Sequence, residues 1–326
     1  MTVTSHQSSV AGQQSSDRLA TGNWRRLTTA ALLAALTAAV SARGGLSAPD
    51  RVAAVYDTIL AAQFDKVDAQ LASTCPPAPM PACDALRAEA AWWEILINPD
   101  SHDVDQRLSA LAATAITSSA GWVEREPQRA EAWFYLAGAY TPLVQLRVLR
   151  GERVSAARDG RKIKDALERA LELDPDLTDA HLGIGLYHYY ADVAPLYAKF
   201  LRWILFLPGG DRVEGLKEIL VARHRGVLLA GEADFQLQQI YLWYENRFRD
   251  ALAVLESLDQ RYPTNPVFLQ RIGDVHEIYF HDLDASIRTW TTLRDRAREH
   301  RVYSSTLIET RADKKLQQLI AQRAKK

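Results

Sequence analysis

The stretch LERALELDPDLTDAHLGIGLYHYY, from Leu167 to Tyr190, combines two helical patterns separated by a proline. Apolar residues recur three and four positions apart on both sides, which is the spacing of one face of an α-helix. Asp174-Pro175 ends the first pattern, because proline lacks the amide hydrogen and restrains the residue before it. Thr178 and Asp179 follow as candidate caps of a second helix. The stretch therefore predicts a helix, a short turn and another helix.

The same order of helix, turn, helix and proline recurs along the chain. It begins with AEAWFYLAGAY at 130–140 and returns in EADFQLQQIYLWYENRFRDALAVLESLDQRYP at 232–263 and PVFLQRIGDVHEIYFHDLDASIRTW at 266–290. The sequence lacks the alternation of apolar and polar residues that a half-buried strand needs. We therefore expect an all-α chain, an α-solenoid in which helical hairpins stack on one another.

These segments resemble the tetratricopeptide repeat, a helical hairpin of about 34 residues with the pattern W-x2-L-G-x2-Y near its start and a proline at its end. Small residues at fixed positions of that repeat allow its two helices to approach closely. Four successive hairpins carry matching residues, namely Trp133, Leu136, Ala137, Tyr140, Ala170 and Pro175 in the first, Ile184, Gly185, Gly215 and Ala222 in the second, Leu237, Tyr241, Ala251 and Pro263 in the third, and Ile272, Gly273 and Ala285 in the fourth.

The segment ADVAPLYAKFLRWILFLPGGDRVEGLKEI carries a second resemblance. It is similar to uncharacterised exported bacterial tetratricopeptide proteins and, more distantly, to a eukaryotic tetratricopeptide family linked to mitochondria and inclusion-body clearance. The resemblance extends over about residues 130–266, and it implies no known chemistry.

The repeat pattern predicts how the chain is organised. Its parts are a disordered leader with a signal peptide (1–48), degenerate N-terminal helical hairpins (49–126), the tetratricopeptide-like array (127–290) and C-terminal capping helices (291–326). We expect the helices of the degenerate hairpins at roughly 50–63, 65–73, 84–97 and 103–124. Two hairpins of the array exceed the repeat length, which predicts insertions of about 14 residues across 141–160 and about 18 residues across 189–210.

Residues 1–48 differ in composition from the remainder of the chain. Their first half is rich in Ser, Gln, Thr and Gly and lacks apolar periodicity, which predicts disorder. Trp24-Arg25-Arg26 precedes the uncharged stretch Leu27–Ala42, and this order of basic and apolar regions is typical of a signal peptide that is cleaved after Ala42. We expect an exported, periplasmic protein, with an uncleaved N-terminal membrane anchor or a cytosolic N-terminus as the alternatives.

The two cysteines, Cys75 and Cys83, bracket the proline-rich loop PPAPMPA. In an oxidising compartment they can close a loop of about nine residues, with a stabilisation of roughly 2–3 kcal/mol. We therefore expect a disulfide, and two unpaired thiols are the alternative. Two cysteines are too few for a disulfide-rich scaffold or a four-thiolate metal site.

Other signals argue against several classes of function. The net charge of −1 argues against nucleic acid as the main partner, because phosphate binding needs a concentrated basic surface. His181 and His188 lie two helical turns apart, but a metal site needs a third ligand, and the repeat pattern places both inside a hairpin. The glycines before Asp211 lack the spacing of a phosphate-binding loop, and we expect Asp211 to cap the next helix. The sequence therefore predicts no catalytic, metal or cofactor site.

In a tetratricopeptide array, the first helices of the hairpins line a concave groove. Aromatic rings and amide groups at these positions suit the backbone of an extended peptide. The predicted partner groove consists of Phe134, Leu182, Tyr189, Tyr190, Phe235, Gln239, Trp243, Gln270, Asp274 and Glu277. The alternative is that the insertion of the second hairpin folds over the aromatic residues and makes them part of the core.

The sequence thus favours a non-enzymatic protein–protein interaction scaffold of the bacterial cell envelope, which binds a protein or peptide in the groove of the solenoid. The alternative is a membrane-associated structural subunit of an envelope complex, docked through the apolar insertion 193–208. That insertion is too short to span a membrane, and Lys199 and Arg202 interrupt it. We therefore expect it to be mostly buried, and contact with a membrane is not favoured.

Overall fold

The computed structural model describes residues 45–193 and 209–325. The chain divides into two units, residues 1–43 and 44–326, and every described helix belongs to the second unit. The predicted leader, signal peptide and cleavage after Ala42 lie outside the described residues. The same is true of the apolar insertion, of which only Val193 is described.

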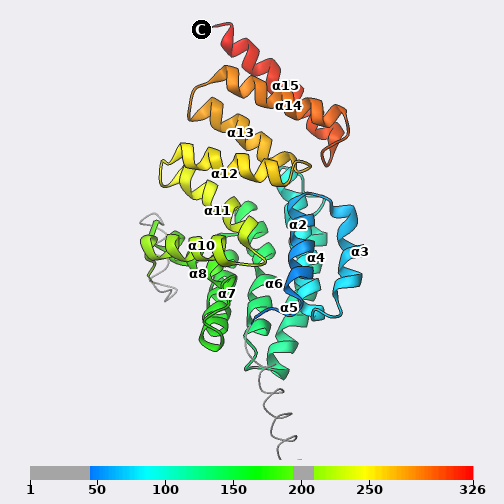
Figure 1. Cartoon of the computed structure of the whole chain (residues 1–326), viewed down its shortest axis with the longest axis vertical. Coiled ribbons are helices and arrows are strands. Elements are labelled where there is room, and N and C mark those ends of the chain that lie inside the picture. The colour runs from blue at the N-terminus through cyan, green and yellow to red at the C-terminus, as the bar shows by residue number, and fades with distance from the viewer. Residues whose placement is uncertain (1–44, 194–208, 326) are drawn as a thin grey trace, which may run out of the picture. The chain divides into compact units, whose positions relative to one another are not determined.

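The described part of the chain is all-helical, as the sequence predicts, with 13 α-helices and no strand (Figure 1). The helices of the first half are α2 (Pro49–Leu60), α3 (Phe64–Thr74), α4 (Met80–Ile97), α5 (Asp105–Arg125), α6 (Ala130–Leu149) and α7 (Arg153–Leu173). The second half contains α8 (Ala180–Val193), α10 (Arg212–Arg225), α11 (Ala230–Trp243), α12 (Phe248–Arg261), α13 (Pro266–Ile278), α14 (Leu283–Arg298) and α15 (Ser305–Arg323).

Helices that follow one another in the chain pack in pairs. The pairs are α2 with α3, α4 with α5, α6 with α7, α8 with α10, α11 with α12, and α13 with α14, and α15 packs on α14. Two glycines allow the close contact in the α8–α10 pair. A Cβ atom on Gly185 would lie 2.6 Å from the carbonyl oxygen of Gly215, and one on Gly215 would lie 2.6 Å from the amide nitrogen of Tyr189. The small residues predicted for this hairpin therefore lie where its two helices touch.

The first of the two predicted insertions does not form a separate segment. Residues 141–160 are helical apart from a short turn between α6 and α7, and these helices are 20 and 21 residues long. Pro142 lies inside α6. The additional residues therefore lengthen both helices of the pair. The second predicted insertion, 189–210, lies mostly outside the described residues.

The sequence predicts Asp179 and Asp211 as helix caps, and the structure agrees for Asp211 only. Asp211 caps α10 as expected, because its carboxylate accepts hydrogen bonds from the backbone N–H groups of Val213 and Glu214. Asp179 does not cap its own helix. Its buried carboxylate instead accepts the N–H groups before α11, at 2.8 Å from Leu229 and 3.0 Å from Leu228. Asp179 thus joins the start of α8 to the start of α11.

The N-terminal helices also contact the C-terminal half of the chain. α2 packs against α11, and α4 packs against both α6 and α13. Tyr262 donates a hydrogen bond to Asp57 of α2 at 2.7 Å, across a sequence separation of 205 residues. Arg311 donates one to the carbonyl oxygen of Ile97 at 2.7 Å. α2 and α4 therefore pack on part of the face that α6, α11 and α13 present.

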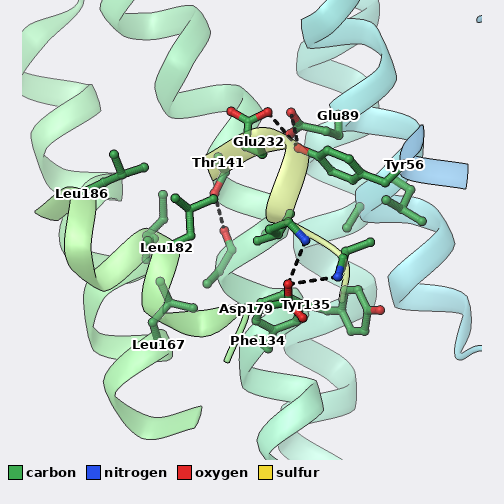
Figure 2. A pocket seen from close by; sticks show the side chains of 18 of the residues that line it. Tyr56, Glu89, Phe134, Tyr135, Thr141, Leu167, Asp179, Leu182, Leu186 and Glu232 are labelled. Carbon is green, nitrogen blue, oxygen red and sulfur yellow. Dashed lines mark hydrogen bonds between the residues drawn. The ribbon is translucent and has the colours of Figure 1, made fainter. Parts of the chain in front are cut away.

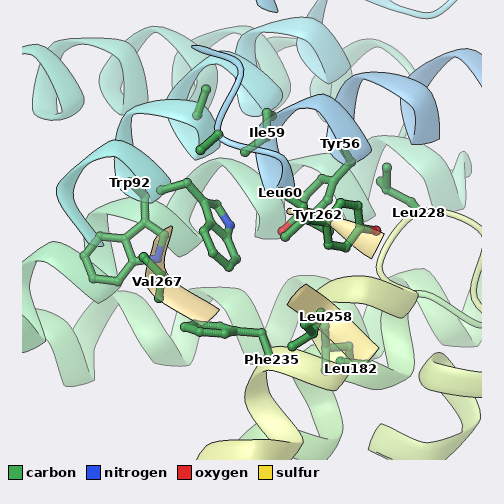
Figure 3. Packing of buried hydrophobic residues seen from close by; sticks show 14 of the residues in the cluster. Tyr56, Ile59, Leu60, Trp92, Leu182, Leu228, Phe235, Leu258, Tyr262 and Val267 are labelled. Carbon is green, nitrogen blue, oxygen red and sulfur yellow. The ribbon is translucent and has the colours of Figure 1, made fainter. Parts of the chain in front are cut away.

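The core continues through this contact (Figure 3). Ile59 and Leu60 of α2 lie on one side of the buried cluster and Phe235 of α11 on the other. Trp93 of α4 is fully buried, and its ring centroid lies 4.7 Å from that of Phe235 and 6.1 Å from that of Phe268. Burial of such large apolar side chains stabilises the fold by about 2–3 kcal/mol each. The N-terminal helices are therefore part of one core with α11 and α13.

Candidate functional site

A cavity of about 120 Å³ remains between the N-terminal helices α2 and α4 and the helices α6, α7, α8 and α11 (Figure 2). This volume is several times the roughly 15 Å³ that a single water needs. Most of the wall is apolar, and its larger apolar side chains are Leu86, Phe134, Ile163, Leu167, Leu182, Leu186, Leu228 and Leu229. A concave, mainly apolar space with a few polar groups is the usual form of a ligand site.

Two carboxyl groups meet at one end of the cavity (Figure 2). Glu89 of α4 and Glu232 of α11 are both buried, and the hydroxyl oxygen of Tyr56 lies 3.4 Å from Glu89 Oε1 and 3.1 Å from Glu232 Oε2. The side-chain amide of Gln236 donates to the other oxygen of Glu232 at 2.7 Å. Because Tyr56 has a single hydroxyl hydrogen, it can donate to only one carboxylate at a time, and a proton on either carboxyl would allow both contacts to be hydrogen bonds.

The surroundings of Glu89 and Glu232 favour a proton on one of the two carboxyl groups. Burial away from water, together with the charge of Glu232, raises the pKa of Glu89 to about 8. Burial also raises the pKa of Glu232, and it raises the pKa of Tyr56 well above its ordinary value. Burial therefore favours a proton on this pair.

The other buried carboxylates of the described residues have different partners. Four of the seven form ion pairs, which are Glu131 with Arg129, Asp159 with Arg147 and Lys162, Asp234 with Arg223 and Arg261, and Asp259 with Arg296. The remaining three, Glu89, Asp179 and Glu232, all line the cavity, and no Lys, Arg or His is among the described residues that line it. Asp179 is compensated by backbone N–H groups. The partners of Glu89 and Glu232 are neutral groups, namely the hydroxyl of Tyr56 and, for Glu232, the side-chain amide of Gln236.

Part of the cavity wall is half-buried, and these residues are Gly138, Thr141 and Gln145 of α6, Ile163 of α7, Gly183 and Leu186 of α8, Leu229 before α11 and Gln236 of α11. A Cβ atom on Gly138 would meet no other atom within 4 Å, so the space beside it is open. Two further polar atoms of lining residues are buried without a hydrogen-bond partner in the described structure, the hydroxyl of Tyr135 and Oε1 of Gln145. The cavity thus has a partly solvent-accessible wall and unsatisfied hydrogen-bonding groups.

Four of the ten residues of the predicted partner groove are not on an open surface. Phe134, Leu182, Tyr189 and Phe235 are buried in the core, with exposed fractions of 5%, 3%, 0% and 2%. Phe134 and Leu182 line the cavity, Phe235 packs on Trp93, and the ring of Tyr189 contacts other tyrosines. Phe235 is buried because α4 packs against it, on the face that was expected to be an open groove.

The other six predicted residues do not meet in one site. Tyr190, Gln239, Gln270, Asp274 and Glu277 are half-buried, and Trp243 is 53% exposed. Lys315 of α15 forms ion pairs with Asp274 and Glu277, at 3.7 and 2.6 Å. The guanidinium of Arg271 lies 5.9 Å from the ring centroid of Trp243. The ten residues therefore divide among the core, the cavity, the contact with α15 and an exposed tryptophan.

The structure also shows the partners of the two cysteines and of His188. Cys75 and Cys83 are joined by a disulfide between α3 and α4. His188 forms a hydrogen bond with Glu218, with 2.8 Å between Nδ1 of the histidine and Oε2 of the glutamate. The described residues contain no group of three or more His, Cys, Asp or Glu side chains that could hold a metal ion. None of the described helices has the length and apolar character needed to cross a membrane.

The sequence analysis missed the acidic end of the cavity. Glu89 stands in the apolar run AEAAWW, and Glu232 follows LLAG. A carboxylate between core residues is a usable signal, because such residues are rarely buried without a partner. The meeting of Glu89, Glu232 and Tyr56 has no local signal, since Tyr56 and Glu232 are 176 residues apart.

Comparison with known proteins adds no family to this description. No family model matches the chain, and no curated protein matches it either. The candidate site therefore rests on the cavity, its carboxyl pair and its open side.

Proposed function

We propose that the helix pairs form a tetratricopeptide-type α-solenoid, and that the protein is a non-enzymatic interaction scaffold that binds a peptide segment of a partner protein. The observation that carries this proposal is the cavity between α6, α8 and α11, the first helices of three successive pairs. Because α2 and α4 form one wall of the cavity, we infer that a partner side chain enters it past the half-buried lining residues. The site is thus a pocket for an anchoring residue rather than a long open groove.

The proposal includes export to the periplasm of a bacterium, with an uncleaved N-terminal anchor as the alternative. The disulfide between Cys75 and Cys83 supports export, because disulfides persist in oxidising compartments. Fractionation of cells that express the tagged protein tests this point. Soluble periplasmic protein supports the scaffold, whereas pelleted membrane protein favours the structural subunit docked through the insertion 193–208.

Two glycines allow a matched test of the cavity. Gly138 of α6 and Gly160 of α7 are both helical and half-buried, and a Cβ atom on either would meet nothing within 4 Å. Only Gly138 belongs to the cavity wall. A leucine at position 138 therefore fills the opening, whereas a leucine at 160 leaves it unchanged.

The experiment is a native pull-down with the wild type, Gly138→Leu and Gly160→Leu, after circular dichroism has established that all three fold alike. We expect proteins that the wild type and Gly160→Leu capture to be lost from Gly138→Leu. Capture of the same proteins by Gly138→Leu would place the binding surface outside the cavity and contradict the proposal.

A further inference from the structure

We propose that the cavity binds a primary ammonium group on a short aliphatic chain, with the ammonium between Glu89 and Glu232 and the methylene groups along the leucine wall. The inference rests on the proposed function in one respect: if the protein binds a peptide segment, the ammonium group belongs to a lysine side chain of that partner. Figure 2 shows the two carboxyl groups together at one end of the cavity, with Leu182 and Leu186 along its side.

The charge of the cavity selects a cation. Buried carboxylates are stable when paired, and the four outside the cavity each have an Arg or Lys partner. Glu89 and Glu232 have no cationic partner among the described residues that line the cavity. A positive ligand supplies that partner, whereas a carboxylate or phosphate would add repulsion in a space shielded from water.

The shape of the site favours an ammonium. Both carboxyl groups line the same end of the cavity, each within 3.4 Å of the Tyr56 hydroxyl oxygen, and a compact –NH₃⁺ presents three hydrogens from one atom. Beyond them the wall is apolar, which suits the methylene groups that lysine buries while its head meets polar groups. A planar guanidinium spreads its donors over a wider fork.

Binding of a cation is coupled to loss of the shared proton. Tyr56 of α2 is the titratable group in contact with the pair, the other titratable residues of the cavity wall are Asp179 before α8 and Tyr135 of α6, and the lining residues of α7 are apolar. Because burial and the charge of Glu232 raise the pKa of Glu89, an ammonium placed beside both carboxyls favours their ionised forms and hence release of a proton. Affinity is therefore expected to rise between pH 6 and pH 8, by up to about tenfold per pH unit.

The test is calorimetric titration of the purified protein with Nα-acetyl-lysine methylamide at pH 6, 7 and 8. The neutral control is the norleucine derivative, which has the same chain with a methyl group in place of the ammonium. We expect the lysine derivative to bind at least tenfold more tightly than the norleucine derivative at pH 8, with release of about one proton at pH 7. Equal binding of the two, or tighter binding of the corresponding arginine derivative, overturns the proposal.

The ammonium group could come from a lysine of a peptide or from a free aliphatic amine, and titration with butylamine distinguishes these two sources. Tighter binding of the lysine derivative than of butylamine supports a lysine of a peptide, and equal binding overturns that assignment. Glu89→Gln and Glu232→Gln should each weaken binding at least tenfold. Asp259→Asn, which alters a buried carboxylate outside the cavity, should leave it unchanged.

The outcomes also separate this inference from the proposed function. Loss of partner capture by Gly138→Leu without binding of the lysine derivative refutes the ammonium site and leaves the scaffold standing. Binding of the lysine derivative with full partner capture by Gly138→Leu refutes the scaffold at this cavity and leaves the ammonium site standing.

Discussion

Buried carboxylates occupy two kinds of surroundings in this protein. Asp259 of α12 is held by Arg296 of α14 through two contacts, at 2.6 and 3.0 Å, and so links successive helix pairs. Glu89 and Glu232 also link helices, but their shared partner is the neutral hydroxyl of Tyr56. The first arrangement stabilises the array, whereas the second leaves charge uncompensated beside a cavity. Such local loss of stability is expected where a protein binds a ligand.

The largest effect is expected where an ion pair of the first kind is broken. Arg296→Met leaves the carboxylate of Asp259 buried without its cation, and it should lower the free energy of unfolding by about 3 kcal/mol. Arg298→Met in the same helix is the matched control. Its partner Glu309 is exposed, so the loss should stay below about 1 kcal/mol. Equal losses in urea unfolding would remove the distinction between buried and exposed pairs.

A substitution in the carboxyl pair of the cavity is expected to increase the free energy of unfolding. The raised pKa of Glu89, about 8 against an ordinary 4.5, means that the folded state holds a proton that the unfolded state releases. Stability is therefore fully present below about pH 4.5 and falls as the pH rises toward 8. Glu89→Gln should raise the free energy of unfolding by about 1–2 kcal/mol at pH 8 and have little effect at pH 4.5.

This prediction is checked by thermal unfolding of both proteins across that pH range. Parallel pH profiles of the wild type and Glu89→Gln would contradict it, because they would assign the pH dependence to other groups.

A smaller effect is expected from filling the opening. Gly138→Leu should raise the free energy of unfolding by about 0.5–1 kcal/mol, since leucine has the higher helix propensity and its Cβ meets no atom within 4 Å. Gly160→Leu should give a similar gain, because its position is equally open. A marked loss of stability in Gly138→Leu alone would show that the opening is closed, which contradicts the described cavity.

The smallest effect is expected at the exposed tryptophan. Trp243→Ala removes a side chain that is 53% exposed, and it should change the free energy of unfolding by less than about 1 kcal/mol. Binding of Nα-acetyl-lysine methylamide should be unchanged, since Trp243 does not line the cavity. Loss of that binding would move the candidate site toward the C-terminal end of α11.

Local patterns predicted the helices well. The predicted segments 50–63 and 84–97 correspond to α2 and α4, and the prolines after Asp174 and at the start of α13 stand at helix boundaries. These features are visible in sequence because spacing of apolar residues and proline act within a few positions. The small residues Gly185 and Gly215 were also placed at a close helix contact.

The candidate site was not predictable in the same way. Its acidic end depends on α2 and α4 reaching α11, a contact between segments that are far apart in sequence. Repeat positions alone placed Phe235 on an open groove, because they carry no information about what covers the groove. Asp179 shows a similar limit, since its partners before α11 are 48 to 50 residues away.

The most direct measurement is the titration of Glu89 by carbon-13 NMR of protein labelled at glutamate side-chain carboxyls, with Glu89→Gln to assign the resonance. We expect a midpoint near pH 8 in the free protein and a lower midpoint after addition of Nα-acetyl-lysine methylamide. A midpoint near 4.5 that does not respond to the lysine derivative would contradict both the shared proton and the ammonium site.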